Sequence, residues 1–151
     1  PDCVRAIESD KSIELRNPSA TRPWQHVLEP LSGYLLLAAS LRKDPLTFVG
    51  SWNFGPSSKE VRTVLEVAEH LVARFGRGRI NCESRNKNPY EALLLQLNCD
   101  RANQILGWYP RWGFEQTLDM TADWYKKVDG GEKAKKVTRR QLYDYFPEIG
   151  R

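Results

Sequence analysis

Three side chains between Arg22 and His26 have the chemistry of a ligand-binding site. Arg22, Trp24 and His26 are each separated by one residue, and in an extended chain such alternate residues lie on the same side. A guanidinium group binds phosphate through paired hydrogen bonds. The alternative interpretation is structural: Arg22 pairs with a carboxylate, Trp24 packs in the core, and His26 hydrogen-bonds to a backbone carbonyl. The residues by themselves favour this structural interpretation.

Polar side chains elsewhere are further candidates for ligand binding. Asn53 precedes Gly55 at the end of an expected strand; it could hydrogen-bond to a ligand, although asparagine beside a turn usually serves the turn. The stretch from Arg85 to Glu91 is an expected loop that includes Tyr90. This mixture of charged, amide and aromatic groups suits a sugar or a nucleotide base, and it is also common in exposed loops.

The motifs of several enzyme classes are absent from the sequence. The glycines form neither G-x-G-x-x-G nor G-x-x-x-x-G-K-[ST], so no phosphate-binding glycine loop is encoded. No tyrosine stands four residues before a lysine, and no G-x-S-x-G is present. The three cysteines form no C-x-x-C pair and have only two histidines to join them, which argues against a zinc site or a disulfide framework. We therefore expect no catalytic, cofactor-binding or metal-binding residues in this chain.

The elements that position these candidates follow from hydrophobic periodicity and turn residues. The pattern predicts a Ser57–Glu60 capping box before the most regular helix and a left-handed Gly76 after it. The apolar residues of the helix at 29–41 lie on nearly every side, which is typical of a helix packed against more than one neighbour. Helices are expected at 1–9, 29–41, 61–75, 98–107, 114–125 and 138–145, and strands at 12–16, 24–27, 47–53, 79–84 and 93–97. This alternation predicts a single α/β domain covering residues 1–151.

Length and charge narrow the class of protein further. The chain has 151 residues, of which 40% are hydrophobic, enough for one domain with a core. The segment from Lys126 to Arg140 holds seven basic and two acidic residues. Its net charge of 7 − 2 = +5 exceeds the net charge of +4 of the whole chain. Such a run of charges is usually a solvated linker, so we expect the last 25 or so residues to be a basic linker followed by a short helix. For the same reason we expect no nucleic-acid partner.

No membrane span or secretory signal is recognisable in the sequence, and the unpaired cysteines agree with a cytoplasmic location. The chain begins at Pro1 and its only methionine is Met120. We expect from this that the chain starts downstream of the beginning of its gene.

Four segments carry a resemblance to a known family. They are RPWQHVLEPLSGYLLLA at 22–38, WNFGP at 52–56, LGWYPRW at 106–112 and DWYK at 123–126. Together they resemble the carboxyl-terminal part of CDP-glucose 4,6-dehydratases, which are extended short-chain dehydrogenases/reductases. The resemblance implies the substrate-binding carboxyl-terminal lobe of such an enzyme, with the Rossmann domain missing from this chain.

The resemblance also implies a reaction. NAD, bound by the missing amino-terminal domain, removes hydride from C4 of the glucose of CDP-glucose; water leaves across C5 and C6, and hydride returns at C6. The product is CDP-4-keto-6-deoxyglucose, a precursor of deoxysugars. The implied partners are a CDP-sugar, the Rossmann domain of the same protein and further copies of the protein in a homo-oligomer. No membrane association is implied. The chain alone is expected to be inactive.

By resemblance, Arg22 binds the diphosphate and Asn53 approaches the nucleotide, with Trp24 and His26 in support. Arg85 is a candidate for a second diphosphate-binding arginine, and Tyr90 and Glu91 are candidates for substrate contacts. Tyr90 stands where the family pattern has histidine, and a phenol does not exchange protons near neutral pH as an imidazole does.

A second function class remains open. In this alternative the chain is a free-standing binding module that uses the basic segment 126–140 to bind an acidic partner. Such binding would weaken steeply with salt.

Overall fold

The computed structural model describes residues 2–82 and 94–150, and it is an α/β structure with two small sheets. The strands are β1 (Ser12–Leu15), β2 (Thr21–Arg22), β3 (Arg62–Thr63) and β4 (Arg79–Cys82). The helices are α1 (Asp2–Glu8), α2 (Leu28–Lys43), α3 (Pro45–Phe48), α4 (Val64–Phe75), α5 (Asp100–Gln104), α6 (Phe114–Asp129), α7 (Ala134–Tyr145) and the 3-10 turn η1 (Pro147–Gly150). The α/β fold class is confirmed.

The two sheets connect distant parts of the chain. β1 pairs with β4 in parallel, with Ile13 opposite Ile80. β2 pairs with β3 in antiparallel fashion, with Arg22 opposite Arg62. The second pair matters for the candidate site, because it places Arg22 beside the chain that enters α4.

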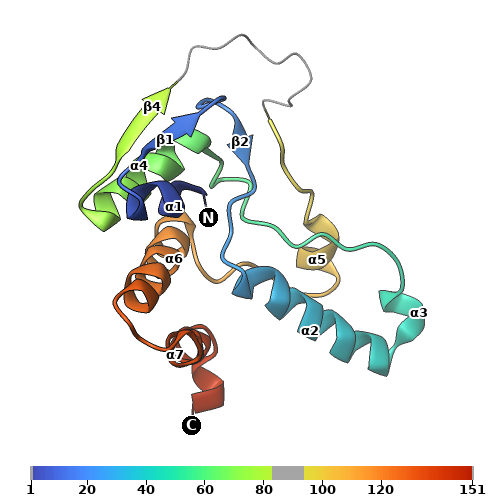
Figure 1. Cartoon of the computed structure of the whole chain (residues 1–151). Helices are drawn as coiled ribbons and strands as arrows, with labels where there is room; N and C mark the ends of the chain where they lie inside the picture. The colour runs from blue at the N-terminus through green and yellow to red at the C-terminus, as the bar shows by residue number, and fades with distance from the viewer. Residues whose placement is uncertain (1, 83–93, 151) are drawn as a thin grey trace.

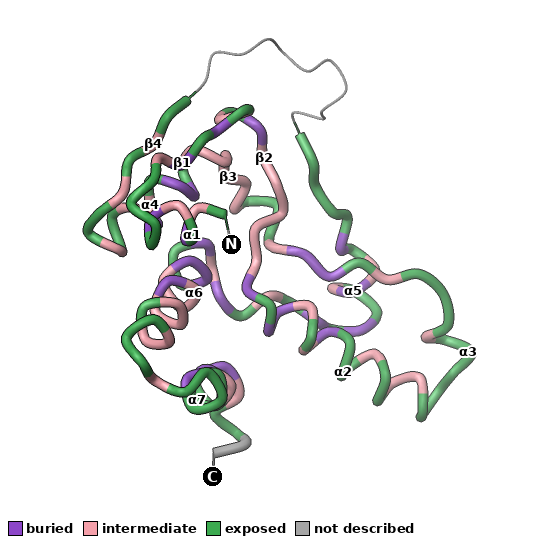
Figure 2. The backbone as a smooth tube through the Cα atoms, viewed as in Figure 1, coloured by how far each residue is buried: buried purple, intermediate pink, exposed green. Residues whose placement is uncertain are grey.

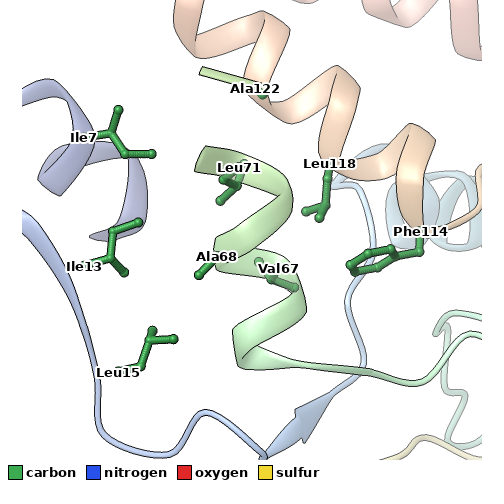
Figure 3. Packing of buried hydrophobic residues seen from close by; sticks show 9 residues of the cluster. All are labelled: Ile7, Ile13, Leu15, Val67, Ala68, Leu71, Phe114, Leu118 and Ala122. Carbon is green, nitrogen blue, oxygen red and sulfur yellow. The ribbon is translucent and has the colours of Figure 1, made fainter. Parts of the chain in front are cut away.

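The main core lies between β1, α1, α4 and α6. Figure 3 shows the side chains of α4 between those of β1 and α1 on one side and those of α6 on the other. The buried members are Ile7, Ile13, Leu15, Val67, Ala68, Leu71, Phe114, Leu118 and Ala122. Removing this apolar surface from water is the main stabilising contribution here.

Two smaller clusters extend the structure beyond this core. Figure 1 shows α2, α3 and α5 on the side of the molecule away from α4. Phe54 and Trp108 form the centre of one cluster there, with ring centroids 5.0 Å apart in an edge-to-face contact. Trp112 and Tyr145 form the other cluster with Leu28, which fixes α7 against the start of α2.

Several predicted helices are confirmed, together with some of their ends. Gly76 follows α4 with a φ of +68° and donates its backbone N–H to Val72 and Ala73. Gly107, which closes the α5 region, has a φ of +67°. A positive φ is accessible to glycine at little energetic cost. The local sequence therefore specifies the ends of these two helical segments.

The capping box of α4 was predicted six residues too early, at Ser57 instead of Thr63. The capping box is formed by Thr63 and Glu66, with reciprocal hydrogen bonds of 3.1 and 2.7 Å, and not by Ser57 and Glu60. Both pairs have the required spacing. Pairing of Arg62 and Thr63 with β2 keeps the chain extended up to Thr63, so only the second box lies at a helix end.

Three predicted strands were also wrong. Residues 24–27 contain no strand, because the pairing occurs one step earlier at Thr21–Arg22. Asp44 accepts a hydrogen bond from Thr47 N and begins α3, so the predicted strand at 47–53 is a helical turn followed by irregular chain. Residues 94–97 of the predicted strand at 93–97 have no strand partner. β-Propensity without a neighbouring strand does not make a strand.

The basic segment is not a linker. It forms the end of α6 and most of α7, joined by a turn at Gly130 and Gly131. Val137, Gln141 and Tyr145 are buried on one side of α7, and this packing makes the segment helical. α2 also differs from expectation, since many of its apolar residues are exposed to solvent (Figure 2).

Candidate functional site

Arg22 lies in the wall of a hollow next to β2. Its Nη1 donates to the Thr21 carbonyl at 2.8 Å, and the side chain is half-buried. We name this the Arg22 hollow; its lining includes Arg22, Pro23, Ser58, Val61 and Leu95. The β2–β3 pairing produces it, because it brings residues 22–23 and 61–62 together.

A second, larger hollow continues from the first. It encloses about 470 Å³ and is lined by Asn98, Asp100, Asn103 and Tyr109, among others. We name it the Tyr109 hollow. The two hollows share Pro56, Ser57, Ser58, Gln96 and Leu97 in their walls. The two hollows are therefore adjacent, and we name them together the groove; the larger part has the volume of a typical small-molecule site.

Asn53 supports the groove from the side. Its Nδ2 donates to the Asn98 carbonyl at 3.0 Å, which ties the turn at residues 53–56 to the loop before α5. Asn53 itself does not line either hollow, whereas Asn98 lines the larger one. The role predicted for Asn53 as a nucleotide contact stays a prediction.

Arg101 holds the residues just before Asn53. Its guanidinium donates to the carbonyls of Val49 and Ser51 at 2.8 and 3.0 Å and lies 4.1 Å from the centroid of the Trp52 ring. Gly50 has a φ of +114°, and a Cβ there would lie 2.9 Å from Arg101 Nη1. Arg101 of α5 and Asn98 in the loop before it thus hold the segment at 49–53 in place beside the groove.

Trp24 has a structural role in the described part of the chain. Its Nε1 donates to the Arg62 carbonyl at 3.1 Å, and its ring packs against the main core. This contact reinforces the pairing of β2 with β3 beside Arg22.

His26 is also part of the interior, with 6% of its surface exposed. Its Nδ1 accepts a hydrogen bond from Leu28 N at 3.3 Å, and its ring lies 4.9 Å from that of Trp112. Burial lowers the pKa of His26, because the charged form loses its hydration. His26 therefore lies uncharged in the segment between Arg22 and α2, where it accepts a hydrogen bond from the first backbone N–H of that helix.

The remaining candidates, Arg85, Tyr90 and Glu91, lie outside the described residues. Their predicted contacts with substrate stay predictions.

Some groove residues were not identified from the sequence. Tyr109 and Asn103 line the larger hollow, yet nothing in their spacing distinguishes them from other polar or aromatic residues. Glu60 lines the Arg22 hollow, and its Oε2 accepts from Phe114 N at 2.8 Å, so this carboxylate caps α6. A sequence pattern does not reveal such a cap between distant segments.

The described parts of the chain contain no cluster of three or more side chains suited to holding a metal ion. Within the same residues, no helix combines the length and the apolar character needed to cross a membrane.

The comparison with curated proteins finds a relative that covers nearly the whole chain. The chain is 39% identical over 146 residues to CDP-glucose 4,6-dehydratase of Salmonella typhimurium. This alignment covers 97% of the chain but 41% of that protein. No protein-family model matches the chain.

Solved structures with a similar fold are nucleotide-sugar enzymes. dTDP-glucose 4,6-dehydratase of Bacillus anthracis, in complex with NAD, has a TM-score of 0.68 at 22% identity, over 89% of this chain and 40% of that one. UDP-glucuronic acid 4-epimerase of Bacillus cereus has a TM-score of 0.67 at 18% identity, over 84% and 39%.

The chain thus spans about two-fifths of the length of each of these proteins. The sequence is therefore similar to the carboxyl-terminal portion of CDP-glucose 4,6-dehydratase, and the fold is similar to that of other nucleotide-sugar dehydratases and epimerases.

Proposed function

We propose that this chain is the nucleotide-sugar-binding portion of an NAD-dependent 4,6-dehydratase that converts CDP-glucose to CDP-4-keto-6-deoxyglucose. The observation that carries the proposal is the position of Arg22. This arginine opens the longest segment of resemblance to the dehydratases, and it lies in the wall of the groove. A guanidinium in a concave wall is suited to a diphosphate, because it offers several N–H donors and a fixed positive charge.

The residues that the structure describes do not fit NAD. Its parallel strand β1 leads into Arg16-Asn17-Pro18 and not into a glycine-rich turn. Binding of NAD's pyrophosphate at such a fold needs glycines so that the backbone can approach closely. In this proposal the hydride transfers therefore take place in another part of the enzyme, and this chain binds and orients the substrate.

The exposed apolar face of α2 is a reason to expect a protein partner that covers it. Val27, Leu31 and Leu35 follow one another at intervals of four residues and are exposed by 63%, 44% and 67%. Contiguous exposed apolar surface usually marks an interface. We propose that the NAD-binding domain of the same enzyme, or a further copy of the chain, covers this face.

The direct test is a titration of the isotope-labelled chain with CDP and with CDP-glucose, followed by NMR. We expect the amide signals of Ser57, Ser58 and Leu97 to shift, because these residues line both parts of the groove. UDP and dTDP serve as competitors, and CDP is expected to bind more tightly than either.

Two results would contradict the proposal. The first is an absence of shifts at millimolar CDP. The second is conversion of CDP-glucose by this chain when NAD is added, because the proposal assigns the redox steps to another part of the enzyme.

A further inference from the structure

The basic residues of α7 are held on a folded surface and not in a solvated linker. α7 has 12 residues, of which four are basic and one is acidic. The helix lies at the end of the molecule away from the two sheets (Figure 1), and none of its residues lines either hollow of the groove. The solvated linker that argued against a nucleic-acid partner is therefore not present in this part of the chain.

α7 has a buried side and a cationic side. Its buried residues are Val137, Gln141 and Tyr145. The basic residues are all exposed: Lys135, Lys136, Arg139 and Arg140. Residues three and four positions apart share one side of a helix, and residues two positions apart lie on nearly opposite sides. The four basic side chains therefore point away from the core.

Most of these cations have no acidic partner. Arg140 donates to Glu132 at 2.7 Å, whereas the other three basic residues of α7 form no ion pair with any carboxylate that the structure describes. Lys133, the residue before the helix, is also exposed and unpaired among the described residues. Asp144, the acidic residue of α7, lies about 100° round the helix from Tyr143. We name the unpaired set the cationic face: Lys133, Lys135, Lys136 and Arg139.

The lysines of the cationic face stand at the end of α7 where positive charge is least favourable. The first turn of the helix contains no acidic residue. The peptide dipoles already place partial positive charge at this end, so added cations destabilise it. An anionic ligand would relieve both contributions at once.

Tyr143 adds aromatic surface beside the cationic face. The residue is 42% exposed and follows Arg139 by four positions, so the two side chains are neighbours on one side of α7. Proteins that bind single-stranded nucleic acid combine these two features, because cations neutralise the phosphates and an aromatic ring stacks with a base.

A membrane surface is another polyanion, but α7 lacks an apolar face for it. Helices that lie on membranes bury their apolar face among the lipids. The corresponding side of α7 is occupied within the protein, where Tyr145 packs with Leu28 and Trp112. The observations therefore favour a nucleic-acid strand, which charge alone is sufficient to bind.

We propose that the cationic face, together with Tyr143, binds the phosphate backbone of single-stranded nucleic acid. The partner is recognised by charge and stacking, so binding depends little on base sequence. This surface is separate from the groove, and the inference goes beyond the proposed dehydratase function without depending on it.

The test measures binding of a fluorescein-labelled oligouridine of about 12 nucleotides, a length within the usual range of single-strand sites. Fluorescence anisotropy follows the affinity of the full chain as the salt concentration rises. Four phosphate contacts predict a slope of log K against log salt of about −2.8. This slope corresponds to a loss of about fiftyfold in affinity between about 50 and about 200 mM salt.

The decisive variant is the triple substitution Lys135→Gln, Lys136→Gln and Arg139→Gln. With one contact left, we expect the slope to fall to about −0.7 and the affinity at about 50 mM salt to decrease by at least about tenfold. Circular dichroism checks that the fold is intact, which is expected because all three side chains are exposed.

The matched control removes the same charge elsewhere, with Lys11→Gln, Lys59→Gln and Arg77→Gln at exposed positions outside α7. It should nearly keep the affinity and the slope. Tyr143→Ala should weaken binding by about fivefold without changing the slope, because it removes stacking and no charge. Tyr143→Phe keeps the ring and should keep the affinity.

Four results would overturn the proposal. They are no binding of the oligonucleotide by the unmodified chain at about 50 mM salt, an equal loss of affinity in the matched control, displacement of the oligonucleotide by excess CDP, and binding to vesicles of anionic lipid that exceeds binding to the oligonucleotide. The second would assign the effect to net charge, the third to the groove and the fourth to a membrane surface.

Discussion

The hydroxyl group of Tyr145 donates a 2.6 Å hydrogen bond to Oε2 of Glu29, although the two residues are 116 positions apart. Glu29 is 0% exposed and also accepts from Arg111 N and Trp112 N. Its carboxylate therefore joins the start of α2, the segment that carries Tyr109, and the end of α7. Burial, and then the hydrogen bond to Glu29, raise the pKa of Tyr145.

Glu29→Gln is expected to destabilise the fold. A carboxylate accepts all three hydrogen bonds, whereas an amide turns its NH₂ toward at least one of the backbone N–H donors. Leaving a buried donor unpaired costs about 2 kcal/mol, and urea unfolding measures this loss.

Tyr145→Phe is the matched comparison for Glu29→Gln. It removes the hydroxyl group, with its hydrogen bond to Glu29 and its 3.1 Å contact with Ser32 Oγ. The carboxylate keeps both backbone donors, so a smaller loss of about 1 kcal/mol is expected. If the two variants are equally stable, the three-donor account of Glu29 is wrong.

His26 is expected to make stability depend on pH. Burial lowers its pKa from the ordinary value of 6.5, so below about pH 6.5 the unfolded chain binds a proton at this ring more readily than the folded chain. The free energy of unfolding should therefore fall as the pH decreases from about 7 to about 5. The ordinary values for Asp44 and Glu66, 3.8 and 4.5, lie below this window.

His26→Asn provides the control, because its side-chain oxygen replaces Nδ1 as the acceptor for Leu28 N without titrating. Urea unfolding of both proteins across this pH range should show a smaller slope for the variant. Equal slopes would exclude His26 as the source, since His70 is present in both.

Arg22→Gln is expected to weaken CDP binding by at least about tenfold, because a charge-assisted hydrogen bond to phosphate is lost. Arg62→Gln is its matched control. Arg62 lies opposite Arg22 in the strand pair, but it contacts the Phe114 ring and Glu66 and lines neither hollow. Calorimetric titration should find CDP affinity nearly unchanged for Arg62→Gln, and equal losses in both variants would argue against a direct contact by Arg22.

The exposed row on α2 predicts self-association of the isolated chain. Val27, Leu31 and Leu35 present a continuous apolar stripe, and pairing two such stripes removes them from water. Sedimentation velocity should show a concentration-dependent shift that Leu35→Glu reduces and that Tyr143→Glu, on α7, does not. A monomer at every concentration would contradict this prediction.

The sequence by itself determined the local features. Gly76 and Gly107 end their segments with a positive φ, and the apolar spacing of α4 and α6 defines the faces that form the core. These features depend on neighbours within a few residues, and the same is true of the motifs that carry the family resemblance. They could therefore be predicted without the fold.

Tertiary structure decided which of the competing local patterns is used. Ser57–Glu60 and Thr63–Glu66 have equivalent capping patterns, and pairing of β3 with β2 selects the second. Glu60 then serves α6 instead. The groove has the same origin, since it joins residues 22–23, 55–61, 95–100 and 109–110. Contacts between distant segments set these outcomes: the burial of Glu29, the exposure of Tyr109 and the placement of Arg22 depend on neighbours that no local pattern contains.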